Sequence, residues 1–83
     1  MEQEIESRLQ MKYKNLVIEV EFDSFRKYAI IVKMEYLGKV YESKIIYKYD
    51  NYYTLDANIS IIEQIIDKNV ILEFFKKGVL YND

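Results

Sequence analysis

The sequence contains no histidine and no cysteine, so the usual nucleophile–base pairs of enzymes and the usual ligands of zinc are missing. A general base would have to be an aspartate, glutamate, lysine or tyrosine, and no serine stands in a G-x-S-x-G context. Both glycines, Gly38 and Gly78, stand where a turn and a helix end are expected, which leaves no glycine-rich phosphate loop. We therefore expect a protein that is not an enzyme, with no cofactor and no metal.

One stretch resembles part of a calcium-binding loop. Asp56, Asn58 and Ser60 follow the D-x-N-x-S spacing, and Asp67 stands at the twelfth position. The sixth position, which requires glycine, is Ile61, and the stretch has helical periodicity. Asp56 or Asn58 as the N-cap of a helix explains the same residues more simply.

Long apolar runs are also missing. No stretch approaches the roughly 20 apolar residues of a membrane span, and the acidic N-terminus lacks a signal-peptide core, which favours a cytoplasmic location. At 83 residues the chain predicts a single α+β domain over residues 1–83. With no disulfide or metal to stabilise so small a core, dimerisation or partner binding is a natural supplement. The many Ile, Lys, Tyr and Asn residues, which have AT-rich codons, favour a low-GC bacterium or one of its phages or plasmids.

Acidic residues slightly outnumber basic ones, 14 to 12, and the net positive charge is concentrated in the middle of the chain. The net charge is −2, with −3 over residues 1–24, +4 over residues 25–49 and −3 over residues 50–83. Four lysines are expected on the outer face of a central hairpin: Lys27, Lys33, Lys44 and Lys48. Glu35 and Glu42 share that face, diagonally placed to pair with Lys44 and Lys33. Binding of single-stranded nucleic acid through these lysines is therefore an alternative to a protein partner.

The N-terminal half predicts a helix and a strand. Ile5 and Leu9 lie on one face of a helix over residues 2–12. Apolar residues then alternate over residues 16–22, which is typical of a strand with one buried face. Asp23-Ser24 is expected to form the turn that follows.

Two further alternating segments, residues 26–37 and 40–49, predict a hairpin. Gly38-Lys39 fits a two-residue type II′ turn, which sets Tyr36 opposite Tyr41 and Val32 opposite Ile45.

The C-terminal third has helical periodicity with a change of phase. Residues 57–67 predict one helix, a break follows at residues 67–69, and Asn69 is a suitable N-cap for a second helix over residues 70–77. A strand over residues 70–75 is the alternative. The fold class is therefore α+β: a three-stranded antiparallel meander with all helices on one face, in the order α-β-β-β-α-α.

Tyrosine is the most distinctive residue that is present, with nine copies. Five tyrosines fall on the face that the helices should cover, at its two ends: Tyr28, Tyr36, Tyr41, Tyr47 and Tyr49. A partner-binding patch is expected at the open end of the sheet, because aromatic residues are enriched at interface cores. Its expected members are Tyr28, Tyr47, Tyr49, Tyr52 and Tyr53. Val17, Ile31 and Ile46 on the outer face form a second candidate, for dimerisation or docking.

These observations favour a small non-enzymatic module that binds and occludes a surface of a larger host protein. The α-β-β-β-α-α layout is similar to that of certain small phage-encoded anti-CRISPR proteins, a likeness of topology that carries no functional residue across. Small size, missing catalytic residues, AT-rich codons and tyrosine-rich ends together fit an inhibitor or accessory factor encoded by a phage or another mobile element. A structural homodimer is a further alternative.

Overall fold

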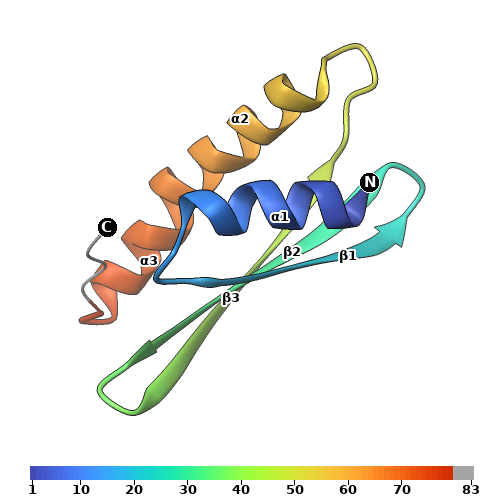
Figure 1. Ribbon diagram of the computed structural model, residues 1–83. Coiled ribbons are helices and arrows are strands. Elements are labelled where there is room, and N and C mark those ends of the chain that lie inside the picture. Colours follow the sequence, from blue (N-terminus) through green and yellow to red (C-terminus); the bar gives the residue numbers. More distant parts are fainter. Residues whose placement is uncertain (80–83) are drawn as a thin grey trace.

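The computed structural model describes residues 1–79 and has the predicted α+β fold (Figure 1). The chain runs in the order α1 (Glu2–Lys12), β1 (Val17–Ser24), β2 (Lys27–Tyr36), β3 (Lys39–Lys48) and α2 (Leu55–Ile65). The π-helical segment η1 (Ile66–Val70) and helix α3 (Ile71–Lys76) follow. The strands form one antiparallel sheet in the order β1-β2-β3, and the helices lie on one face of it. Tyr81 lies outside the described residues.

The core lies between this helical layer and the inner face of the sheet. Ile5 and Leu9 of α1 are completely buried, as their four-residue spacing predicts. They join a single cluster with alternating residues of β1 and β2, such as Ile18, Ile30 and Val32. The apolar pattern therefore identifies the buried face of the first helix and of the sheet correctly.

The two hairpin turns differ from the prediction, because both use left-handed residues that the pattern does not mark. Strand β1 continues through Ser24, so the chain reverses at Phe25-Arg26, where Arg26 has a φ of 60°. The β2–β3 turn is Leu37-Gly38, with φ values of 52° and 77°, in place of Gly38-Lys39. Positive φ at both central positions is the type I′ geometry, which matches the twist of the strands as the expected II′ turn would.

The change of turn slips the β2–β3 register by two residues. Met34 lies opposite Tyr41 and Ile30 lies opposite Ile45, whereas the sequence-based register paired Tyr36 with Tyr41. A slip of two residues leaves each side chain on its predicted face, because side chains alternate with period two. The faces are therefore as predicted, and the cross-strand neighbours are different.

The C-terminal segment is continuous helix, so neither the predicted break nor the alternative strand forms. Segment η1 covers residues 66–70, and Asn69 lies inside it without capping a new helix. The buried residues Ile62, Ile66, Val70 and Phe74 are four apart, and each such step advances about 40° around a regular helix. The wider π turn takes up this drift, and the apolar stripe stays against the sheet.

Both ends of the helical segment are capped by local hydrogen bonds. The Thr54 hydroxyl accepts from the N–H of Ala57 at 3.1 Å, so the N-cap is Thr54 in place of the predicted Asp56 or Asn58. At the other end Gly78 has a φ of 83°, and Val79 N–H donates to the Phe74 carbonyl at 2.9 Å. This is a Schellman ending, as Lys76-Lys77-Gly78 predicts.

Candidate functional site

Three parts of the chain lie towards the same end of the sheet: the β1–β2 turn, the β3–α2 loop and the start of α1 (Figure 1). We call this region the aromatic end and define it by Phe22, Phe25, Tyr28, Tyr49, Tyr52 and Tyr53. Its geometry depends on how the β3–α2 loop, residues 49–54, is held.

Asn58 holds that loop from inside the protein. Its side chain is completely buried, and its Oδ1 accepts from the Tyr47 hydroxyl at 2.6 Å and from the Asp50 N–H at 3.0 Å. Its Nδ2 donates to the carbonyls of Asp50 and Thr54, both at 2.9 Å. Asp50 extends the network, because its carboxylate accepts from the Tyr52 N–H at 2.9 Å. One buried amide therefore fixes both ends of the loop that carries Tyr52 and Tyr53.

Tyr47 connects this network to the core. Its ring is buried, and its hydroxyl reaches Asn58 without solvent contact. Burial raises the pKa of the Tyr47 phenol, and the negative charge of Asp50 raises it further. The phenol therefore stays protonated and donates to Asn58 throughout the physiological range.

The aromatic rings of this end form a row across the sheet. Phe22 contacts Tyr28 edge-on with centroids 6.4 Å apart, and Tyr28 contacts Tyr49 in the same way at 6.4 Å. Tyr49 is buried, whereas Phe22 is 60% exposed and Tyr52 is 97% exposed. The row therefore leads from the core to a surface that no part of residues 1–79 covers.

The structure divides the predicted tyrosine patch. Tyr47 and Tyr49 pack in the core, Tyr28 is half-buried, and Tyr52 and Tyr53 project into solvent. Tyr47 and Tyr49 therefore support the patch from the core, and Tyr52 and Tyr53 are its accessible members.

Two exposed phenylalanines of this end were missed by the sequence reasoning. Phe22 follows the buried alternation of β1, but it is the last inward residue of the strand and lies at the end of the helical layer. Phe25 is 77% exposed in the turn, with the Arg26 guanidinium over its ring at 4.8 Å. A bulky apolar residue next to an expected turn was the signal that could have found it.

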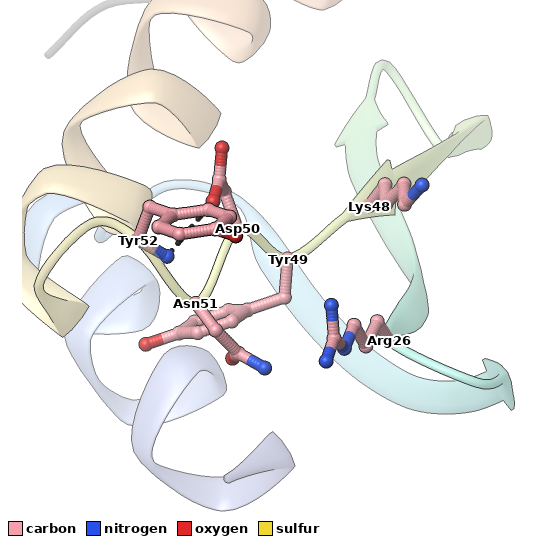
Figure 2. Close-up of a pocket in the computed structure, with 6 residues that line it drawn as sticks. All are labelled: Arg26, Lys48, Tyr49, Asp50, Asn51 and Tyr52. Carbon is pink, nitrogen blue, oxygen red and sulfur yellow. Dashed lines mark hydrogen bonds between the residues drawn. The ribbon is translucent and has the colours of Figure 1, made fainter.

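A shallow pocket of about 270 Å³ lies beside the row, lined by Arg26, Lys48, Tyr49, Asp50, Asn51 and Tyr52. Figure 2 shows the rings of Tyr49 and Tyr52 on one side and the side chains of Arg26 and Lys48 on the other. The Tyr49 N–H donates to the Arg26 carbonyl at 2.6 Å and so joins the two sides. Lys27 lies directly opposite Lys48. Three cations therefore border an exposed aromatic surface, and Asp50 is the acidic group in the pocket.

The four lysines of the nucleic-acid alternative do not act as one patch. Lys33 lies between Glu19, 3.2 Å away, and Glu42, 3.8 Å away, and the hydrogen bond to Glu19 raises the pKa of the Lys33 ammonium. Glu42 lies directly opposite Lys33, in place of the predicted diagonal. Within residues 1–79 no ion pair joins Glu35 to Lys44. Lys27 and Lys48 lie opposite each other beside the aromatic end, and Lys44 lies in mid-strand opposite Ile31.

The candidate docking face of Val17, Ile31 and Ile46 lies on the uncovered side of the sheet. Val17 and Ile46 are exposed and Ile31 is half-buried. The three residues lie in different cross-strand rows, with Lys33 opposite Val17 and with Glu19 and Lys44 opposite Ile31. The strip is therefore diagonal and bordered by charges.

No helix within residues 1–79 combines the length and the apolar character that a bilayer crossing requires. Compared with models of protein families, with curated proteins and with solved structures, the chain gave no match.

Proposed function

We propose that this chain is a small non-enzymatic interaction module that binds a surface of a larger host protein through its aromatic end. The observation that carries the proposal is the group of exposed aromatic side chains Phe22, Phe25, Tyr52 and Tyr53, of which the two tyrosines stand on a loop that hydrogen bonds to the buried Asn58 hold in place. Binding energy at interfaces concentrates in aromatic residues of this kind.

The preorganised loop supports the proposal because ordering a flexible loop on binding costs free energy. Asn58 fixes the β3–α2 loop in the free protein, and Phe25 is held by the tight β1–β2 turn. Little backbone conformational entropy is therefore left for the segments that carry Tyr52 and Phe25 to lose when a partner binds.

Charge indicates the kind of surface that the partner presents. Arg26, Lys27 and Lys48 border the aromatic side chains. Like charges across an interface are costly, so a suitable partner surface is apolar with acidic groups beside it. An inhibitor encoded by a phage or another mobile element, which occludes such a surface of a host protein, is the biological role that we propose.

Affinity purification from a low-GC bacterial lysate tests this proposal. We expect one dominant captured protein, and we expect the double variant Tyr52→Ala, Tyr53→Ala to lose most of the capture. Phe75→Ala is the matched control, because Phe75 is also exposed but lies on α3, away from the aromatic end. Equal capture by the wild type and the double variant would exclude the aromatic end as the binding site.

Binding of single-stranded nucleic acid is the second candidate. The observation that favours it is that Lys48, with Lys27 opposite it on β2, lines the same pocket as the exposed ring of Tyr52, because bases stack on aromatic rings near cations. Titration with oligonucleotides at two salt concentrations distinguishes the candidates. Affinity that falls steeply with salt and with Lys48→Glu supports this function, and no binding at low salt removes it.

A further inference from the structure

The two edges of the sheet differ in whether their outward backbone groups have hydrogen-bond partners. At the β1 edge, side chains of α1 accept hydrogen bonds from two N–H groups that point away from β2. Ile18 N–H donates to Gln10 Oε1 and Val20 N–H donates to Glu6 Oε1, both at 2.9 Å. Gln10 Nε2 also donates to the Leu16 carbonyl at 2.6 Å. Helix α1 therefore occupies the positions that a fourth strand would need.

The β3 edge has no such cover. Backbone groups of successive residues in a strand point alternately to either side, and Tyr36 and Lys39 bond to each other across the two-residue turn. The groups of Val40, Glu42, Lys44 and Ile46 therefore point away from β2. Within residues 1–79 no hydrogen bond reaches them. Strand β3, Lys39–Lys48, thus presents an open edge along its length.

The side chains along this edge have an order that complements itself. The four residues whose backbone groups point away from β2 are, in chain order, apolar, acidic, basic and apolar: Val40, Glu42, Lys44 and Ile46. Val40 is 61% exposed and Ile46 is 50% exposed. When the order is reversed, as in an antiparallel neighbour, each apolar residue meets an apolar one and each charge meets its opposite.

We propose that a second copy of this chain pairs with the open β3 edge, antiparallel, about a two-fold axis at Ser43. Val40 then lies opposite Ile46 of the other copy, and Glu42 lies opposite its Lys44. The two three-stranded sheets join into a continuous six-stranded sheet. The interface is isologous, so each pair occurs twice and the assembly is closed.

The neighbouring registers are disfavoured by charge, which makes this one specific. Sliding the second copy by two residues in one direction sets Lys44 against Lys44, and sliding in the other direction sets Glu42 against Glu42. Like charges directly opposite each other destabilise a strand pair. On the inner face the proposed register sets Tyr41, which is half-buried, opposite Ile45 of the other copy. Glu73, which accepts from the Ser43 hydroxyl near the axis, has its charge balanced by Lys77 at 3.1 Å.

The proposal does not depend on the function proposed above. The β3 edge runs along the side of the sheet, and its antiparallel pairing places the two aromatic ends at opposite ends of the assembly, both free to bind.

Charge variants at the edge test the proposal. Glu42→Lys sets lysines against Lys44 of the other copy, and Lys44→Glu sets glutamates against Glu42, so each variant alone is expected to be a monomer. Mixed in equal amounts, they regain opposite charges at every position and are expected to form a heterodimer. Glu35→Lys is the control, because it changes the net charge as Glu42→Lys does but lies on β2, and it is expected to stay dimeric.

Sedimentation equilibrium between roughly 10 μM and 1 mM covers the affinities expected of a small interface. Wild-type protein that is a monomer over this range overturns the proposal, and so does a mixture of the two variants that does not associate. Amide exchange in the wild type gives a test that needs no variant. The amides of Glu42 and Lys44 are expected to become protected as the concentration rises, and exchange that is fast at all concentrations contradicts the pairing.

Discussion

Replacing Asn58 with alanine should weaken the fold far more than the loss of one polar side chain at the surface would. The change removes four hydrogen bonds of 3.0 Å or less, which join Asn58 to Tyr47, to Asp50 twice and to Thr54. Each is worth about 1 kcal/mol net, and the loop groups can regain water, so we expect a loss of about 2–4 kcal/mol in the free energy of unfolding. A domain of this length has about 4–12 kcal/mol in total, so the loss is a large share.

Urea unfolding followed by far-UV circular dichroism measures this loss. Asn51→Ala is the matched control, because Asn51 lies exposed in the same loop and is expected to change stability by less than about 0.5 kcal/mol. If Asn58→Ala unfolds within about 0.5 kcal/mol of the wild type, the buried amide does not hold the loop and the reasoning fails.

Asn58→Asp separates the hydrogen-bond account from simple loss of packing. The aspartate keeps the acceptor for Tyr47 but turns a second oxygen towards the carbonyls of Asp50 and Thr54. Burial and these carbonyls disfavour its charge, so its folded-state pKa is raised above the unfolded value of about 3.9. The variant should therefore regain stability relative to Asn58→Ala as the pH falls, and a constant difference between pH 7 and pH 4 contradicts this account.

Three further predictions concern other parts of the structure. Because the pKa of the Tyr47 phenol is raised on folding, its contribution to the free energy of unfolding is present below a pH of about 10 and is lost as the pH rises further. In urea melts, the stability of Tyr47→Phe should therefore fall less steeply with alkaline pH than that of the wild type. Leu37→Asn gives the β2–β3 turn a residue that tolerates positive φ, and the melting temperature should rise by an amount equivalent to about 0.5–1 kcal/mol; no change or a decrease would show that the turn is not type I′. Tyr13→Phe removes the bonds from the Tyr13 hydroxyl to the Asp67 carboxylate at 2.7 Å and the Glu63 carbonyl at 3.1 Å, and chemical unfolding should report a loss of about 1–3 kcal/mol unless the hydroxyl is redundant.

The sequence predicted the fold class well because hydrophobic periodicity reports which side of an element is buried. Residues 2–12 and the alternating strands are as expected, and the inward side chains of β2 and β3 are on the predicted face. Periodicity does not report a slip of two residues, because such a slip preserves every face. The position of the turn therefore decided the register, and Leu37 in a left-handed conformation was not expected from its residue type.

The candidate site was harder to predict because long-range contacts define it. Asn58 looked like an N-cap or a calcium ligand in its local context, but its partners lie in β3 and in the loop before α2. The sequence pattern does not distinguish the four tyrosines of residues 47–53 from one another. Only the path of the loop determines that Tyr49 is buried and Tyr52 is exposed. A phase change in the C-terminal helix likewise indicated a break, because a π turn has no signature in the pattern of residues 66–70.

The cover that Glu6 and Gln10 give to β1 sets an upper limit on how far sheets of this protein can grow. With β1 covered, a unit has a single open edge, so the proposed pairing would end at two copies. A unit with two open edges has a valence of two, and each addition would expose a fresh edge for the next, as in a fibril. Helix α1 would thus limit assembly: by covering the β1 edge, its side chains Glu6 and Gln10 would allow a closed dimer and prevent an open-ended polymer.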